Sequence, residues 1–526
     1  MSRKTSRPPG RQQCRAFNFE SLEPRTMMSA SKTIAVKGPV APPTGPVATP
    51  SLIAAPVLGA LRTTSTGPFT PAQIRSIYGF DKLSLNGAGT TIAIVDAFDD
   101  PTLIQDLHVF DQKFGLSDPS VTIAKEIDGD GNPPRADKGW SLETALDVEW
   151  AHAIAPAAKI LLCQATDNNT DNLMFMADYA RNFSGVSVVS MSFGGREFEQ
   201  SWNPSSWFDE NQTDYDSNVF TTPQGHRPVS FVASAGDVGS IVAYPSTSPN
   251  VLAVGGTVIT AFESLTTVNK ATAGSVSATP FVSSGPTNFA PMSYDTETAW
   301  SNGGGGFSGV ESRPAYQNGF NSNSMRSVPD VAYAATGFWI FNSADGGWET
   351  VQGTSAGAPQ WAGLIALVNQ GRAQLGGDTL ANTMSDIYRL PASDFHDITT
   401  GNTTDGSGLS YTATVGFDQT TGRGTPIANL LVNDLIHSEY LPPPLKVWPI
   451  GVVGIVGSGT TAASKAIVAT VTAKPTTTTS VARVAGIANS PIISRIGHGA
   501  RATTMRAADA ADGLFEALFG LNGRLS

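Results

Sequence analysis

Ser355 is the residue of this sequence best placed to act as a nucleophile. It stands in the segment GTSAGAPQWAG, immediately before an apolar helical run, so its hydroxyl is expected at a helix N-terminus. A hydroxyl in that position is exposed to a substrate, and free N–H groups of the first turn can stabilise a developing oxyanion. A GTSA segment alone is more often a simple helix cap, so a nucleophilic Ser355 requires a base nearby.

The candidate base is a pair of carboxylic acids. In an ordinary subtilisin, Asp96 of IAIVDAF would be the triad aspartate and a histidine in an HGTH-like segment would follow, but none of the six histidines has that setting. The segment SLETALDVEW instead carries Glu143 and Asp147 four residues apart, on one face of a helix. Its apolar neighbours leave little of this helix for solvent.

Two carboxyl groups close together in a partly dry site share a proton, and the pKa of one rises. Glu143 can then act as general base to Ser355 while Asp147 orients it. Because carboxylates titrate below histidine, this arrangement predicts an acidic working range.

A third acid, Asp237, follows an apolar strand in the segment FVASAGDVGS. The simplest reading is an ordinary turn aspartate, which Gly-Asp segments commonly supply. If Asp237 faces Ser355, its protonated form can donate a hydrogen bond to the oxyanion of a tetrahedral intermediate.

The elements that must position these residues alternate between strands and helices. TIAIVDAF, KILLCQA and VSVVSMSFG have the apolar runs of buried strands, and LETALDVEWAHAIA has a helical pattern. This alternation predicts an α/β fold, with a mainly parallel central sheet and helices on both faces.

Composition divides the chain into four expected regions. Residues 1–32 form a basic leader that includes SLEPRTMMSA, and residues 33–66 form a Pro/Ala/Thr linker, with order expected to begin near Pro68. Residues 67–441 form the folded domain, and residues 442–526 form a low-complexity Ala/Thr/Val tail.

Charge and composition exclude several classes of function. The net charge of -11 and the lack of a clustered basic face argue against nucleic-acid binding. No apolar run reaches the roughly 20 residues of a transmembrane helix, and Cys14 and Cys163 alone cannot form a disulfide framework. SLEPRTMMSA resembles the LEPR-type leader of some bacterial extracellular proteins, so we expect an extracellular or cell-surface location. We also expect a monomer.

The motif blocks LETALDVEW, SMSFGG, ASAGDVG, ETAWSNGGGGFS, PDVA and GTSAGAPQWAG, in this order, resemble the sedolisin (serine-carboxyl peptidase) family. The resemblance implies a subtilisin-like fold, acid-active endopeptidase activity on polypeptides and one calcium ion. It assigns the base to Glu143, its partner to Asp147, the oxyanion acid to Asp237 and the nucleophile to Ser355. By the same resemblance, Ser192, Gly194 and Gly305 hold the substrate backbone.

The calcium site also has a basis in the residues. Asp397 and Asp418 lie in Gly/Thr-rich loops, where carboxylate and carbonyl oxygens suit a hard cation, although two Asx turns would explain them equally well. The resemblance implies side-chain ligation by Asp397 and Asp418 and carbonyl ligation by Ile398, Thr414 and Gly416. Thr414 departs from the glycine usual in the family.

Two alternatives remain at this stage. A non-catalytic calcium-binding surface or binding module on the same fold would be expected to lack the serine or one of the acids, and all four are present. A histidine-based subtilisin is disfavoured by the missing HGTH segment. Family members usually carry a long folded pro-domain, whereas the residues expected before the catalytic region here, 1–66, are mostly linker-like. We therefore expect either that a short leader suffices or that activity is controlled differently.

Overall fold

The computed structural model describes residues 31–38, 47–50, 53–55, 64–65, 68–197, 214–263, 286 and 291–438, and four short strands between residues 467 and 505. The chain divides into two compact units, Met1–Leu441 and Pro442–Ser526. All the residues discussed above as candidates for chemistry lie in the first unit.

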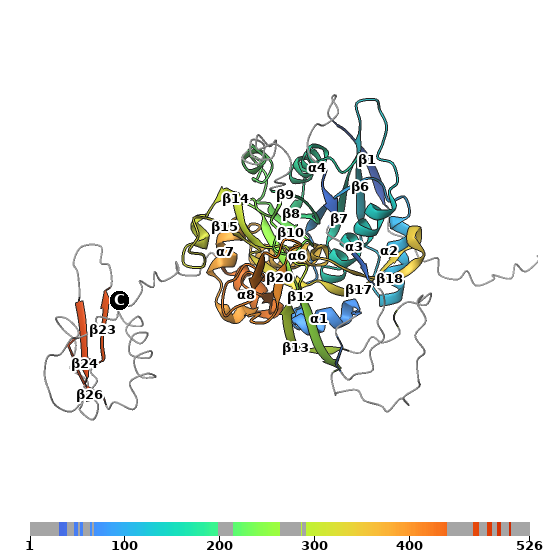
Figure 1. Ribbon diagram of the computed structural model, residues 1–526. Helices are drawn as coiled ribbons and strands as arrows, with labels where there is room; N and C mark the ends of the chain where they lie inside the picture. Colours follow the sequence, from blue (N-terminus) through green and yellow to red (C-terminus); the bar gives the residue numbers. More distant parts are fainter. Residues whose placement is uncertain are drawn as a thin grey trace, which may run out of the picture. The chain divides into compact units, whose positions relative to one another are not determined.

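The first unit is built on a ten-stranded sheet (Figure 1). Its strands follow the order β1-β6-β7-β5-β8-β10-β12-β13, and β4 and β16 also pair with β12. All the pairs are parallel except those of β13 and β4 with β12. The strands are β1 (Lys32–Lys37), β4 (Thr64–Ser65), β5 (Thr91–Ala97), β6 (Val121–Ile127), β7 (Lys159–Ala165), β8 (Val186–Met191), β10 (Ser230–Ser234), β12 (Leu252–Glu263), β13 (Met292–Ala299) and β16 (Val331–Ala334).

Alternate side chains of the central strands enter two different cores. On β5, Ile92 and Ile94 belong to one cluster of buried residues, and Ala93 and Val95 belong to the other. Successive side chains of a strand point to opposite faces, and a parallel sheet is buried on both. The predicted α/β fold with a mainly parallel sheet is therefore confirmed.

Helices cover both faces of the sheet. Apolar residues of α1, α2, α3, α6, α7 and α8 enter the first core, and those of α4 enter the second. In the view of Figure 1, α4 lies above strands β8 and β10 and α8 lies below them. The helices are α1 (Pro71–Tyr78), α2 (Leu103–Phe114), α3 (Lys138–Ile154), α4 (Thr170–Asn182), α6 (Gly357–Gln374), α7 (Thr383–Arg389) and α8 (Ala428–Ile436).

The first unit also contains smaller sheets of two or three strands. They have the orders β11-β9-β2, β17-β18-β3, β14-β15, β19-β22 and β20-β21. Their strands are β2 (Thr49–Pro50), β3 (Ile53–Ala55), β9 (Phe193–Arg196), β11 (Ala243–Tyr244), β14 (Gly306–Ser312), β15 (Met325–Val328), β17 (Thr336–Asn342), β18 (Gly347–Gln352), β19 (Phe395–His396), β20 (Asn402–Thr404), β21 (Ser410–Thr412) and β22 (Thr425–Pro426).

The expectation that residues 33–66 form a linker, and that order begins near Pro68, is wrong. Strand β1 pairs with β6 over six positions, and Val36 and Ala48 are buried in the second core. The prediction failed because it used amino-acid composition alone. A strand added to the edge of a sheet obtains its hydrogen bonds from the sheet, so it needs few large apolar residues and has no distinctive composition. Most of the predicted leader, residues 1–32, lies outside the described residues.

In the second unit, the described backbone forms a four-stranded antiparallel sheet within the range predicted as a low-complexity tail. Its strands are β23 (Ile467–Thr472), β24 (Val481–Gly486), β25 (Ile492–Arg495) and β26 (Thr504–Met505).

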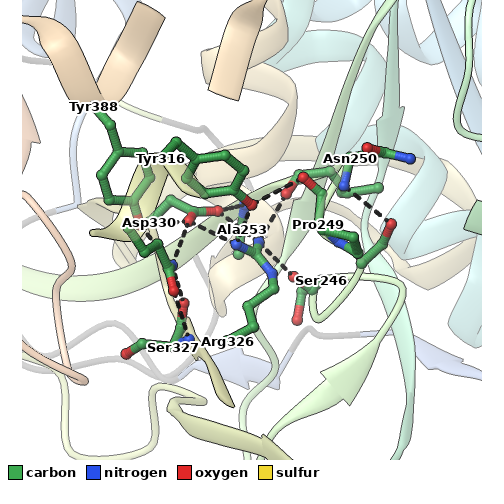
Figure 2. Close-up of polar contacts among 12 residues, drawn as sticks. Ser246, Pro249, Asn250, Ala253, Tyr316, Arg326, Ser327, Asp330 and Tyr388 are labelled. Atoms are coloured by element: carbon green, nitrogen blue, oxygen red, sulfur yellow. Dashed lines mark hydrogen bonds and ion pairs between the residues drawn. The ribbon is translucent and has the colours of Figure 1, made fainter. Parts of the chain in front are cut away.

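A fully buried ion pair connects β15 to β12 and α7 (Figure 2). Arg326 of β15 donates to both carboxylate oxygens of Asp330, at 3.0 and 2.8 Å, and neither side chain is exposed. Asp330 also accepts from the backbone N–H of Ala253 on β12 and from the hydroxyl of Tyr388 on α7. Arg326 donates in addition to the carbonyl oxygen of Ser246. Such a pair is tolerated in a core only because its hydrogen-bonding groups are largely satisfied.

Candidate active site

Ser355 lies in a single 3₁₀ turn, Thr354–Ala356, which leads directly into α6. Its side chain is buried, and its Oγ donates to the carbonyl oxygen of Ser192 at 3.3 Å. The helix can begin this close to the sheet because residue 357 is glycine: a Cβ there would lie 2.7 Å from Val254 Cγ1. The sheet and the glycine together determine where the hydroxyl stands.

Glu143 and Asp147 lie on α3, and both are fully buried. Asp147 Oδ1 accepts a hydrogen bond from Ser192 Oγ at 2.8 Å. Within the described part of the chain, Asp147 Oδ2 and both oxygens of Glu143 have no hydrogen-bond partner with good geometry. Ser192 therefore links the acidic pair to Ser355, through its hydroxyl on one side and its carbonyl on the other.

Burial makes it unfavourable for both acids to be charged at once. Burial raises the pKa of Glu143 well above its ordinary value, the charge of Asp147 adds to this, and the nearby Ser355 hydroxyl lowers it. Burial, followed by the charge of Asp96, raises the pKa of Asp147 well above its ordinary value, and the bond from Ser192 opposes the rise. Since two such groups cannot both ionise easily, the pair shares its proton and titrates as a unit.

Asp237 contacts Thr354, the residue that precedes Ser355 in the chain. It follows β10 in a turn where Gly236 has a φ of 103°. Its Oδ1 accepts from both the N–H and the hydroxyl of Thr354, each at 2.8 Å. Its Oδ2 is buried and has no partner among the described residues. Burial raises the pKa of Asp237 to about 7, against the effect of the Thr354 bonds, so in acid this carboxyl carries a proton that it can donate.

Asp96 is a further acid that sequence reasoning had considered only as a subtilisin-type aspartate. It lies on β5, fully buried, and neither of its oxygens has a hydrogen bond of good geometry within the described residues. Burial raises its pKa to about 7, a nearby Thr144 hydroxyl lowers it and Asp100 raises it further. Its charge acts on both Asp147 and Glu143. Its position at the carboxyl end of a central parallel strand was the signal, because such ends converge on active sites.

The three residues predicted to hold substrate occupy different positions. Ser192 contacts both Asp147 and Ser355, and Gly194 lies on β9. A Cβ on Gly194 would lie 3.0 Å from Ala243 Cβ, so glycine allows β9 and β11 to approach closely. Gly305 donates its N–H to Ile241 and packs against the Gln419 backbone, where a Cβ would lie 2.0 Å from the carbonyl oxygen. The substrate contacts of Gly194 and Gly305 stay predictions.

The residues predicted to bind calcium are brought together. Gly416 N–H donates to both oxygens of Asp397, at 3.1 and 3.0 Å, and Thr414 N–H donates to Asp418 Oδ2 at 2.8 Å. Ile398 follows Asp397 and is buried. The contacts place Gly416 beside Asp397 and Thr414 beside Asp418, and carboxylates and carbonyls are donor types that calcium takes. Asp418 Oδ1 also accepts from the N–H groups of Thr420 and Thr421, as in an Asx turn. Among the described residues there is no group of three or more His, Cys, Asp or Glu side chains placed to hold a metal.

No described helix is long and apolar enough to cross a membrane.

The chain is similar to known peptidases in sequence. The Subtilase family model matches residues 142–396. Kumamolisin of Bacillus sp. (strain MN-32) is 32% identical over 73% of this chain and 67% of its own length. Physarolisin of Physarum polycephalum is 29% identical over 70% of this chain and 68% of its own length.

A solved structure of Pseudomonas sedolisin, a serine-carboxyl proteinase complexed with two molecules of pseudo-iodotyrostatin, has a TM-score of 0.56 and 24% identity to this chain. It covers 70% of this chain and 98% of the sedolisin chain, which shows the shared subtilisin-like fold. On the identity to kumamolisin and the shared fold, the chain belongs to the sedolisin family of serine-type peptidases.

Proposed function

We propose that the protein is an acid-active serine-carboxyl endopeptidase in which Ser355 is the nucleophile, Glu143 the general base, Asp147 its orienting partner and Asp237 the oxyanion acid. The observation that carries the proposal is one cluster of buried residues. The Ser355 hydroxyl donates to the Ser192 carbonyl, and the Ser192 hydroxyl donates to Asp147, one of the two buried carboxyls of α3.

Each group then has one chemical task. Ser355 Oγ attacks the carbonyl carbon of the peptide bond as its proton passes to Glu143, and Asp237 donates a hydrogen bond to the oxyanion. The tetrahedral intermediate collapses, and the leaving amine takes the proton from Glu143. A water molecule, deprotonated by the same carboxylate, hydrolyses the acyl-enzyme and frees Ser355.

The mechanism requires Glu143 to be ionised while Asp237 is protonated. With the pKa of Asp237 at about 7, its donor proton is lost as pH rises through neutrality. We therefore expect activity in acid that disappears above about pH 7, the reverse of the limit that a histidine base would impose.

Membership of the sedolisin family supports the other parts of the proposal, which concern the substrate, the oligomeric state, the location and the metal ion. We infer a polypeptide substrate held by the backbone near Ser192, Gly194 and Gly305, a monomeric enzyme and an extracellular or cell-surface location. The leader motif SLEPRTMMSA supports that location. We also propose one calcium ion, held by Asp397, Asp418 and the carbonyls of Ile398, Thr414 and Gly416, which would supply positive charge to two carboxylates and brace their loops.

The test is cleavage of denatured protein from about pH 2.5 to about pH 8 by wild type, Ser355→Ala and Glu143→Gln. Both substitutions should reduce kcat by about a thousandfold or more, because each removes a member of one catalytic unit. Glu149→Gln is the matched control: Glu149 is a buried glutamate of the same helix with a raised pKa, but it accepts from the backbone of Phe341, away from Ser355.

Activity that peaks in acid, that both substitutions abolish and that Glu149→Gln retains within about fivefold would support the mechanism. A folded wild type inactive at every pH would favour the non-catalytic binding module. Activity retained by Glu143→Gln would assign the base to another residue.

A further inference from the structure

The turn that carries Asp237 is not made rigid by its own residues. Gly236 (φ 103°) and Gly239 (φ 65°) flank Asp237 and Val238, and both adopt left-handed backbone conformations. Glycine has more backbone freedom to lose than any other residue, so contacts with other parts of the chain must hold this turn in one conformation. Val238 is 46% exposed, so solvent lies one residue away from a carboxylate oxygen that is itself buried.

Two sides of the turn are held by backbone hydrogen bonds. On the side of the nucleophile, Gly236 N–H donates to Thr354 Oγ1 at 3.0 Å. On a second side, Gly304 N–H donates to the carbonyl oxygen of Gly236 at 2.6 Å, and Gly239 N–H donates to that of Asn302 at 2.8 Å. These bonds fix the backbone at the two glycines.

The β20–β21 hairpin, residues 402–412, lies against a third side of the turn. A Cβ on Gly239 would lie 2.1 Å from the carbonyl oxygen of Thr404, so glycine lets the hairpin pack directly against the turn. Ser240 Oγ donates to the carbonyl oxygen of Thr403 at 3.0 Å and lies 3.0 Å from Thr403 Oγ1, which can donate to it. Both residues are buried. A pair of buried, mutually bonded hydroxyls therefore joins the turn to the hairpin.

Other bonds also hold the hairpin. Thr404 N–H donates to the carbonyl oxygen of Ser301 at 3.1 Å. Ser410 Oγ donates to the same carbonyl oxygen of Thr403 as Ser240 does, at 2.8 Å. Loss of the Ser240 hydroxyl would therefore free the turn, while the hairpin stays in place and its buried carbonyl keeps a partner.

We propose that Ser240 and Thr403 are positioning residues that hold the turn against the hairpin and so keep Asp237 Oδ2 in place for the oxyanion. Asp237 precedes Ser240 by three residues, and its Oδ1 is tied to Thr354, so a shift of the turn would move Oδ2. A displacement of about 1 Å at a reacting group can cost about 100-fold in rate. The role in the reaction rests on the proposed function; the restraint on the turn does not.

The first experiment measures the steady-state kinetics of Ser240→Ala at the acid optimum. The value of kcat should fall by about 10-fold or more while KM changes by less than about twofold, because the oxyanion forms only after substrate has bound. Thr403→Val removes the other hydroxyl, so it should act in the same direction and replaces Ser240→Ala if that variant folds poorly. Thr403→Ser, which keeps the hydroxyl, should retain the wild-type kcat.

The matched control is Ser230→Ala. Ser230 lies at the start of β10, the strand that leads to the turn, and its buried hydroxyl is bonded to the hydroxyl of Thr383 at 2.7 Å. The substitution removes the same kind of bond from the opposite end of the same strand, so kcat should stay within about twofold of wild type. A fall in kcat as large as that of Ser240→Ala would overturn the proposal.

The pH profile separates positioning from a general loss of stability. Burial raises the pKa of Asp237 to about 7, and a loosened turn admits water, which favours the charged form and lowers that pKa. In Ser240→Ala the alkaline limit of activity should therefore move to lower pH by about half a pH unit or more, and in Ser230→Ala it should not move. The charge of Asp237 raises the pKa of Glu143, so the acid limit, where Glu143 gains its proton, should not fall.

The second experiment tests the restraint without catalysis, in the Ser355→Ala background. Hydrogen exchange is followed at the backbone amides of Gly236 and Gly239, which are both bonded in the structure. Exchange should be about 10-fold faster with Ser240→Ala than with Ser230→Ala, because the turn opens more often.

Equal exchange in these two variants would overturn the restraint, whether or not the enzyme is active. Faster exchange with an unchanged kcat and an unchanged alkaline limit would overturn the role in the reaction. A wild type inactive at every pH would instead refute the proposed function, and the exchange rates would still decide whether the hairpin holds the turn.

Discussion

At the scale of single residues, Asp237 has one carboxylate oxygen held by two hydrogen bonds and the other without a partner among the described residues. Thr354 donates twice to Oδ1, which leaves Oδ2 as the atom able to carry and donate a proton. We expect Asp237→Asn to lower kcat by about 100- to 1,000-fold with little change in KM, because the interaction forms only with the oxyanion. Steady-state kinetics at the acid optimum measure the split, with Val238→Ala, a change at the neighbouring exposed residue, as control. A rise in KM with unchanged kcat would instead assign Asp237 to ground-state binding.

At the scale of elements, the Arg326–Asp330 pair holds β15, β12 and α7 together (Figure 2). Asp330→Asn should reduce the free energy of unfolding by about 3–5 kcal/mol, because it leaves a buried guanidinium without its counter-ion. The comparison is Asp345→Asn, which breaks the partly exposed pair with Lys138 and should cost less than about 1 kcal/mol. Urea unfolding of both variants in the Ser355→Ala background gives the two values; similar losses would show that burial of the first pair contributes little.

The calcium loops are a second prediction at this scale. Saturating calcium should raise Tm by about 3–8 °C over the EGTA-treated protein, since a ligand bound only by the folded state stabilises it. Asp397→Asn should abolish most of this difference. Asp405→Asn should preserve it, because Asp405 accepts its bonds within its own exposed turn from Ser407 and Leu409. Thermal scans with and without calcium measure the effect, and a Tm independent of calcium in wild type would remove the ion from the proposal.

At the scale of the whole molecule, buried carboxyls make stability depend on pH. Among the described residues, six buried or half-buried carboxyls have a pKa raised to about 6 or 7, chiefly by burial: Asp96, Asp100, Asp237, Glu311, Glu349 and Asp394. Between about pH 4 and about pH 7 the folded protein therefore binds more protons than the unfolded chain, and stability falls as pH rises. His396, with its pKa lowered to about 4 by burial, acts in the opposite direction over part of this range.

We accordingly expect Ser355→Ala to unfold at a higher temperature at about pH 4 than at about pH 7. Adding Asp96→Asn should reduce the slope of stability against pH by up to about 1.4 kcal/mol per pH unit, the contribution of one proton. Asp128→Asn is the control: hydrogen bonds from Asn132 lower the pKa of Asp128, so it is ionised throughout this range. Calorimetry at several pH values checks the slope, and a slope that Asp96→Asn leaves unchanged would place the proton uptake on other groups.

The α/β architecture could be predicted from the sequence alone, and the candidate acids could be chosen from it. Buried strands and the helix that carries Glu143 and Asp147 leave local patterns of period two and 3.6, and the motif blocks around Asp237 and Ser355 are contiguous. These features depend on neighbours in the chain, so they can be read before the fold is known.

The contacts among these residues depend on the tertiary fold, because they join distant parts of the chain. Ser192 links Asp147 to Ser355 across separations of 45 and 163 residues, and the proximity of Asp96 to the pair depends on the packing of α3 against β5. The pairing of β1 with β6, of Thr49–Pro50 with β9 and of Ile53–Ala55 with β18 left no periodic signal in a stretch rich in Pro, Ala and Thr. Strand addition takes its energy from main-chain bonds to a distant edge, and main-chain groups are the same in every residue except proline.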